Sequence, residues 1–203
     1  MAQSTRVDRF KQYVSDCYPF GVLILLAFVV VLGCDSNNSS LTEQNPFGEV
    51  YLSEEKFKKE VYKNEENYKI VSNAATVEAF TIDPSSQWQS WGQATVEDYP
   101  IIEGPVGLNP EIASEFINFM TSKKSFNVIL GAKGCRPMPG VRIKFTGKVK
   151  SIDVLICFLC AHLGVFEDGE LIGWGDFDCT EKRLIRLVQS VFPDDPKIQE
   201  LSK

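Results

Sequence analysis

The chain has 203 residues, of which 44% are apolar and 24% charged, a composition typical of one globular domain with appendages. Its formal net charge is −6, and Lys and Arg are not clustered in any one segment, which argues against a nucleic-acid-binding protein. The sequence contains six cysteines but one histidine, His162, so any His-dependent catalysis would have to use this residue.

The amino-terminal segment joins a basic stretch to a short apolar run. Arg6, Arg9 and Lys11 precede thirteen uninterrupted apolar or small residues at positions 20–32. A helix of this length spans roughly 20 Å, whereas a bilayer core requires about 20 apolar residues. The run is therefore short for a transmembrane helix and has the length of the apolar region of a signal peptide.

The apolar run ends in Val31-Leu32-Gly33-Cys34, which resembles the lipobox of bacterial lipoproteins. In that motif a small residue precedes the cleaved bond, and the thiol of the following cysteine accepts the lipid. The resemblance implies that residues 1–33 are a signal peptide and that Cys34 becomes the acylated amino terminus. Each buried CH₂ of an acyl chain such as palmitate adds about 0.8 kcal/mol, so several chains on one cysteine anchor firmly.

Two other interpretations of this segment stay open: residues 18–33 could be an uncleaved signal anchor or a buried core helix. The lipoprotein and the signal anchor share one topology, in which the globular part is bound to the cell membrane and faces the periplasm or the exterior. Asp35 directly follows Cys34. In enterobacterial lipoproteins an aspartate at this position is associated with retention in the inner membrane, which is the location that the resemblance implies here.

The composition changes after the lipobox. Ser, Asn and Gln dominate residues 35–49, and no pattern repeats at strand or helix spacing. We therefore expect residues 34–50 to be a flexible tether and residues 51–203 to form a single domain. The expected partners are the membrane, reached through the lipid, and a protein or small ligand, but no nucleic acid.

The first part of the domain predicts a helix followed by a strand. Residues 53–68 are highly charged and carry apolar residues along one helical face. Residues 68–82 are β-prone and end in the turn-forming Asp83-Pro84. Residues 87–105, which include Trp88 and Trp91, have the composition of an irregular loop.

The segment 109–122 is the clearest predicted helix. Asn109 has the residue type of an N-cap, and Pro110 suits the first helical position. Apolar side chains recur at helical spacing and predict one buried face: Ile112, Phe116, Phe119 and Met120.

The rest of the chain predicts strands and a final helix. Strands are expected at residues 128–130, 140–146, 151–166 and 171–177. The long apolar run 151–166 is interpreted as one central strand covered on both faces. Asp168-Gly169 predicts a type I′ hairpin turn, and Thr180 is expected to cap the last helix. The whole pattern predicts an α+β fold, an antiparallel sheet of about four strands with helices packed on one face.

Cys157 and Cys160 form a Cys-x-x-Cys pair within the predicted central strand. In an extended strand they would point to opposite faces, with Cα atoms about 10 Å apart. A disulfide requires less than about 7 Å, so the two cysteines are not expected to bond to each other. The hairpin register predicted from Asp168-Gly169 places Cys160 opposite Phe177 and Cys157 opposite Thr180.

That register also puts Cys160, His162 and Cys179 on one face of the sheet. Such a set could bind zinc, although the sequence supplies no evident fourth ligand. Asp176 and Asp178 fall close to His162, where an acid–base role is a further alternative.

Cys135 lies in a Gly/Pro-rich loop and is the natural long-range partner of Cys157 or Cys160. In an oxidising compartment we expect structural disulfides or inert buried thiols, and the alternatives are a metal site and redox catalysis. A Cys135–Cys157 disulfide would close a loop of about 20 residues and contribute roughly 3 kcal/mol in the chain-entropy model.

A loop cysteine followed by an aliphatic run that ends in Cys157-Phe158-Leu159-Cys160 resembles a set of uncharacterised bacterial proteins. The likeness covers about residues 74–192, beginning well before Cys135. It implies a shared fold and a structural cysteine cluster, and it implies no activity.

Together these features predict a membrane-anchored lipoprotein with a non-enzymatic domain, either a binding or an envelope-associated module, that requires no cofactor. The sequence contains no Gly-rich phosphate loop and no GxSxG or HExxH motif. The competing prediction is a thiol-redox or zinc-binding protein that uses Cys135, Cys157, Cys160 and His162.

Overall fold

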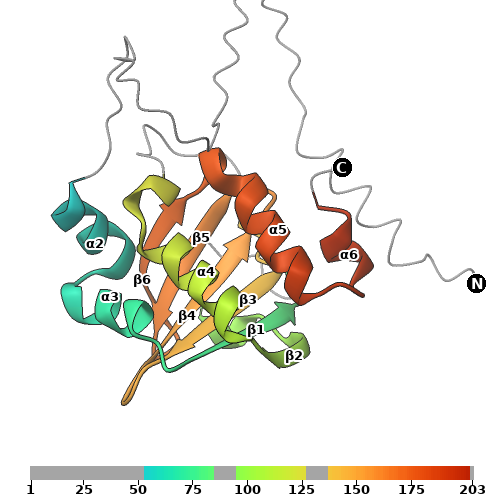
Figure 1. The fold of residues 1–203 in the computed structure, drawn as a ribbon, viewed down its shortest axis with the longest axis horizontal. Helices are drawn as coiled ribbons and strands as arrows, with labels where there is room; N and C mark the ends of the chain where they lie inside the picture. The colour runs from blue at the N-terminus through green and yellow to red at the C-terminus, as the bar shows by residue number, and fades with distance from the viewer. Residues whose placement is uncertain (1–52, 85–94, 127–136, 202–203) are drawn as a thin grey trace, which may run out of the picture. The chain divides into compact units, whose positions relative to one another are not determined.

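The computed structural model describes residues 53–84, 95–126 and 137–201, which form helices packed on one antiparallel sheet (Figure 1). Within these residues the sheet has six strands in the order β2-β1-β3-β4-β5-β6. The strands are β1 (Thr76–Ile82), β2 (Ile101–Gly107), β3 (Val141–Thr146), β4 (Ser151–Cys157), β5 (His162–Glu167) and β6 (Glu170–Asp176). The predicted α+β class and antiparallel sheet are confirmed, but the expected number of about four strands is wrong.

The helices bury their apolar sides against one face of the sheet, and Figure 1 shows α4 and α5 crossing in front of the strands. They are α2 (Glu54–Tyr62), α3 (Glu65–Ser72), α4 (Pro110–Thr121), α5 (Glu181–Val191) and α6 (Pro196–Gln199). The described residues also form short 3₁₀ turns: η2 (Val96–Asp98) before β2, η3 (Lys123–Ser125) after α4 and η4 (Asp178–Thr180) before α5. The chain divides into two units, Met1–Asn37 and Asn38–Lys203, and all described residues belong to the second.

The sheet has buried side chains on both faces. The larger cluster joins helix residues such as Phe116 and Leu184 to strand residues such as Ile143 and Val154. The smaller cluster lies on the opposite face and consists of Phe80, Ile82, Val96, Tyr99, Leu155 and Phe166. Because side chains alternate along a strand, β4 contributes to both clusters, as expected for a central strand.

The helix predicted over residues 53–68 is two helices. Ser53 caps α2 as its residue type suggests, by accepting a hydrogen bond from the Lys56 N–H at 3.2 Å. Lys63 then adopts a φ of 67°, which ends the helix. The side chain of Asn64 accepts a hydrogen bond from the Asn67 N–H at 2.9 Å and starts α3.

Helix α3 occupies the first part of the segment 68–82 that was expected to be β-prone throughout. Only Thr76–Ile82 forms a strand there. The Asn64 cap and the two glutamates behind it favour the helix locally, and Val71 is fully buried in the helix-side core.

Helix α4 confirms the prediction for residues 109–122. The side chain of Asn109 accepts a hydrogen bond from the Ile112 N–H at 2.9 Å, and Pro110 is the first helical residue. Phe116 and Phe119 are buried with Met120, whose carbonyl oxygen accepts a hydrogen bond from the hydroxyl of Tyr62.

The carboxyl-terminal helix α5 begins directly after Thr180, as predicted. Thr180 does not cap it through its side chain, however. Its hydroxyl instead donates to the carbonyl oxygen of Ser125 at 2.8 Å, which ties the start of α5 to the turn η3. The strand expected at residues 128–130 lies outside the described residues.

The single central strand expected over residues 151–166 is wrong. The chain turns between Cys157 and His162, so the run forms the two antiparallel strands β4 and β5. Ala161, with a φ of 49°, takes the left-handed conformation that this turn requires. The turn carries none of the usual Gly, Pro, Asn or Asp residues, and so the sequence pattern does not reveal it.

The irregular segment expected at residues 87–105 ends in a strand, β2, at one edge of the sheet. Most of its residues are exposed, including Ile101 and Ile102, and it pairs with β1 through shifted registers. Gly104 and Pro105 lie within it, and proline is tolerated there because an edge strand need not donate on both sides. The sheet has six strands instead of about four because β2 forms at its edge and because the β4–β5 turn divides one expected strand into two.

The predicted hairpin between β5 and β6 is confirmed at its tip. Asp168 and Gly169 have φ values of 50° and 83°, as a type I′ turn requires, and Glu167 is the partner of Glu170. The register then shifts between Val165 and Phe166. The shift displaces every pairing beyond it by one residue from the predicted register.

Candidate functional site

The chemically reactive side chains gather at one end of three neighbouring strands. Cys157, the last residue of β4, is the Cα partner of His162 at the start of β5. His162 is in turn the partner of Asp176 at the end of β6. Directly opposed residues share a face of a sheet, so these three side chains form one row. Cys157 is two residues from Leu155 in β4, and His162 is four residues from Phe166 in β5. Residues at even spacing share a face of a strand, and Leu155 and Phe166 belong to the smaller cluster, so the row lies on the face opposite the helices.

The β4–β5 turn brings the two sulfur atoms of the Cys-x-x-Cys pair together. Cys157 Sγ lies 3.5 Å from Cys160 Sγ, and both residues are buried. The expectation that they point to opposite faces about 10 Å apart is wrong, because it assumed an uninterrupted strand. At this distance the sulfurs are in contact but do not share a bond, which would measure about 2.05 Å.

Cys157 also has a backbone contact from a distant part of the chain. The Met138 N–H donates to Cys157 Sγ at 3.2 Å. Buried Tyr99 lies near the same sulfur: burial raises the pKa of its phenol, and Asp98 and Cys157 add to that shift. Three separate segments therefore converge on this cysteine.

His162 is held between an acid and an aromatic ring. Its Nε2 lies 3.3 Å from Asp176 Oδ2, and the two side chains are only 11% and 4% exposed. This ion-pair distance is not accompanied by an aligned hydrogen bond to Nε2 among the described groups. The ring of Trp174 meets the imidazole edge-to-face with centroids 5.9 Å apart. The predicted proximity of Asp176 to His162 is confirmed.

The other predicted site residues are placed differently. The expectation that Cys160 lies in a strand opposite Phe177 is wrong, since Cys160 lies in the turn before β5. Cys157 is likewise not opposite Thr180 but opposite His162. Cys179 belongs to η4, and its side chain lies outside the described residues, as does all of Cys135. Within the described ranges, no three His, Cys, Asp or Glu side chains are arranged to hold a metal ion.

A second polar pair lies on the same face and was missed from the sequence. Arg142 Nε donates to Asp153 Oδ1 at 2.8 Å, with side-chain exposures of 17% and 11%. The guanidinium also lies 5.0 Å from the ring centroid of Phe80. The sequence contains a signal for this pair, because Asp153 interrupts an apolar run and a buried carboxylate needs a partner.

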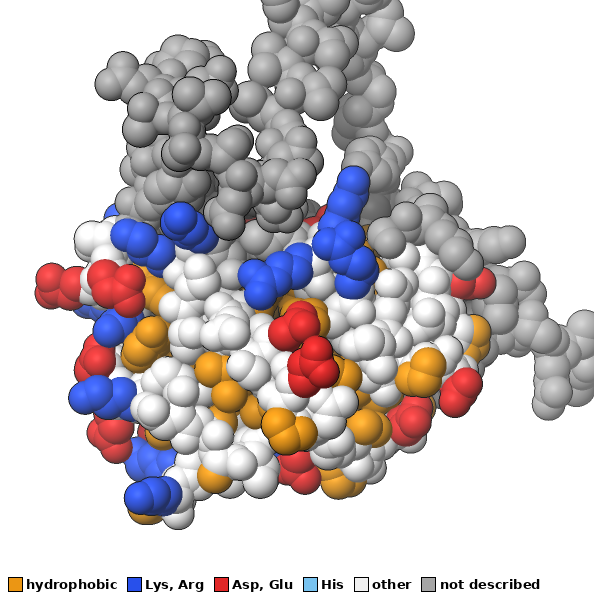
Figure 2. Space-filling view, viewed as in Figure 1, with side chains coloured by type: hydrophobic (Ala, Val, Ile, Leu, Met, Phe, Trp, Pro, Cys, Tyr) orange, Lys and Arg blue, Asp and Glu red, His pale blue; other side chains and the backbone are white. Residues whose placement is uncertain are grey.

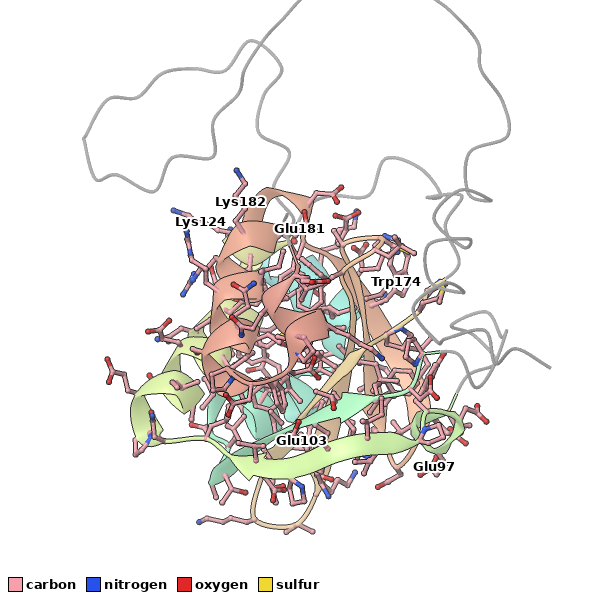
Figure 3. All side chains as sticks on the ribbon, turned by 90° about the vertical axis from the view of Figure 1, so that its right-hand side faces the viewer. Glu97, Glu103, Lys124, Trp174, Glu181 and Lys182 are labelled. Atoms are coloured by element: carbon pink, nitrogen blue, oxygen red, sulfur yellow. The ribbon has the colours of Figure 1, made fainter. Side chains whose placement is uncertain are left out.

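The outer surfaces carry both signs of charge. On the helix side, Figure 2 shows basic and acidic side chains interspersed outside the grey atoms. In a view turned by 90°, Figure 3 shows Trp174 of β6 lying away from Lys124 and Lys182. Trp174 is 46% exposed and, with Ile101 and Ile102, is one of the large apolar residues that face solvent in the described part of the chain.

No family model, curated protein or solved structure matches the chain. The described helices include none whose length and apolar character would allow it to cross a membrane. The resemblances noted from the lipobox and from the cysteine pattern therefore stay predictions.

Proposed function

We propose that the protein is an exported lipoprotein, anchored by acyl chains on Cys34, whose α+β domain is a non-enzymatic binding or envelope-associated module. The observation that carries the proposal is the order of features along the chain. A basic stretch, a short apolar run, Gly33-Cys34 and a polar tether precede a domain whose first described helix is capped at Ser53. That order is typical of a lipid-anchored domain held away from the membrane surface.

The surface of the domain supports a binding role. Its exposed large apolar side chains include Trp174 on one edge strand and Ile101 and Ile102 on the other. Aromatic and aliphatic side chains of this kind anchor proteins and small ligands. The buried polar groups engage each other instead, as the 2.8 Å contact between Arg142 and Asp153 illustrates.

The proposed location is the cell membrane, with the domain facing the periplasm or the exterior. Retention in the inner membrane is the more specific proposal, and it rests on Asp35 directly after Cys34. Residues 34–50 would act as the tether that separates the domain from the lipid headgroups.

The test uses Cys34→Ser with Cys17→Ser as the matched control, since Cys17 lies on the other side of the apolar run. Cells expressing each variant are labelled with radioactive palmitate, and membranes are separated from soluble fractions. We expect Cys34→Ser to lose the label and to accumulate as the unprocessed precursor, whereas Cys17→Ser behaves as the wild type. A labelled or normally processed Cys34→Ser protein would contradict lipidation, and an unlabelled wild type of full length in the membrane would favour the signal anchor.

The competing function is a thiol-redox or zinc-binding protein that uses Cys135, Cys157, Cys160 and His162. The 3.5 Å separation of the two buried sulfurs favours the thiol alternative. Metal analysis of the purified protein distinguishes the zinc-binding from the thiol-redox function, because a zinc protein would contain one equivalent of zinc that a chelator removes.

A further inference from the structure

We propose that Cys157 and Cys160 form a thiol–disulfide exchange site, in which a disulfide held by Cys160 is transferred to a bond between the two cysteines. The co-reactant is a disulfide, either with a small thiol or with another cysteine. This proposal goes beyond the proposed binding module, and it does not depend on lipidation.

The first support is the distance between the sulfurs. An attacking thiolate must approach the sulfur that it displaces, and Cys157 Sγ already lies 3.5 Å from Cys160 Sγ. The two residues are three apart in a turn, and turn geometry brings Cα atoms within about 7 Å. That span suits a disulfide, so the Cys157–Cys160 bond can form with little backbone movement.

The second support is the position of the turn. Leu159, between the two cysteines, is 57% exposed, whereas Cys160 is 6% and Cys157 0% exposed. The turn therefore reaches the surface, and Cys160 lies closer to it than Cys157. Cys160 is the disulfide-bonded cysteine of the pair, and Cys157 is the thiol that lies behind it.

The third support is the polar environment of Cys157. The Met138 N–H donates to its sulfur at 3.2 Å, a contact that favours the thiolate. His162 is its Cα partner on the same face, and His162 is held at 3.3 Å from Asp176. We assign His162 as a positioning residue beside Cys157.

The step is balanced without an oxidant. The Cys157 thiolate attacks Cys160 Sγ, and the Cys157–Cys160 bond forms as the bond from Cys160 to the third sulfur breaks. The departing thiolate takes up the proton that Cys157 lost. One disulfide is consumed and one is formed.

The experiment starts from the reduced full-length protein in detergent and uses oxidised glutathione as the probe. After acid quenching, thiols are alkylated and the protein is cleaved between the two cysteines, after Phe158, so that the linkage is visible by mass spectrometry. We expect the wild type to yield the Cys157–Cys160 disulfide without a lasting adduct. Cys157→Ser should keep Cys160 in a disulfide with another sulfur, either glutathione or a further cysteine, and Cys160→Ser should react at Cys157 at least ten-fold more slowly.

His162→Gln tests the positioning role. We expect the adduct on Cys160 to form at the wild-type rate but to resolve more slowly, with a changed dependence of that second step on pH. If a variant fails to fold, the linkage between Cys157 and Cys160 is instead mapped in the wild type over a series of glutathione potentials. Wild-type maps that never contain the Cys157–Cys160 linkage would overturn the proposal, as would identical lasting adducts in wild type and Cys157→Ser.

Discussion

Two glycines of β6 let neighbouring groups approach the sheet. A Cβ atom on Gly173 would lie 2.5 Å from the carbonyl oxygen of Glu60 and closer still to that of Val61, so α2 rests directly on the strand. A Cβ on Gly175 would meet the ring of Phe126 at the same separation. The backbone of α2 is less able to yield than a side chain, which makes Gly173 the more restrictive position.

We therefore expect Gly173→Ala to lower the free energy of unfolding by about 3 kcal/mol, since the added methyl group must push α2 off the sheet. Urea denaturation measures the loss. Gly107→Ala in β2 is the matched control, because a Cβ there meets nothing within 4 Å, and it should change stability by less than about 0.5 kcal/mol. Equal effects of the two substitutions would contradict the direct packing of α2 on β6.

The ionisation of Glu167 makes the stability of the fold depend on pH. It accepts hydrogen bonds from Lys150 Nζ at 2.8 Å and from Asn67 Nδ2 at 3.3 Å. The bond from Lys150 lowers the pKa of Glu167 below its ordinary value, against the opposing effect of partial burial. A carboxylate with a lowered pKa stabilises the fold above its ordinary pKa, and this contribution is lost as the pH falls through the lowered value.

Glu167→Gln should consequently destabilise the protein at pH 7 and have little effect at pH 3. The difference at pH 7 should stay below about 1 kcal/mol, because Lys150 is largely solvated. Urea titrations at the two pH values measure it, with Glu66→Gln as the control, since Glu66 lies 4.0 Å from the same ammonium and is 73% exposed. A cost that persists at pH 3 would show that the carboxylate charge is not responsible.

Among the elements, helix α4 depends on its amino-terminal cap. The Asn109 side chain satisfies the Ile112 N–H, which would otherwise lack a partner within the helix. We expect Asn109→Ala to cost about 1 kcal/mol and Asn109→Ser to cost much less, because serine also caps. Chemical denaturation compares the two, and equal losses would contradict the capping role.

The elements also show which signals in the sequence suffice. Helix α4 and the Asp168-Gly169 hairpin were predicted because each carries its own local signal, a cap or a turn dipeptide. The β4–β5 turn was not, because its residues Phe158 and Leu159 favour burial, and tertiary packing rather than turn chemistry bends the chain there. The edge strand β2 was missed because Gly104 and Pro105 suggest a loop.

These errors carried over to the candidate site. Missing the turn put Cys157 and Cys160 on opposite faces, although their sulfurs are 3.5 Å apart. A register shift of one residue in the β5–β6 pair then determines that Asp176 lies opposite His162. Spacing in the sequence predicts such a row only when both the turn and the bulge are known.

At the scale of the whole molecule, the proposed protein consists of a lipid anchor, a tether and a small α+β domain. The domain contributes an exposed tryptophan and isoleucines at its two edge strands and a buried cysteine pair at one end of the sheet. The anchor would confine these features to the membrane surface and, on the exported side, to an oxidising compartment in which disulfide exchange has a co-reactant.

The most direct test of this account is the intact mass of the native protein extracted from membranes with detergent. We expect a chain that begins at Cys34 and is heavier than the unmodified polypeptide by its acyl groups, with a reducible disulfide revealed by alkylation. An unmodified chain of 22.8 kDa that still begins at Met1 and is recovered from the soluble fraction would contradict it.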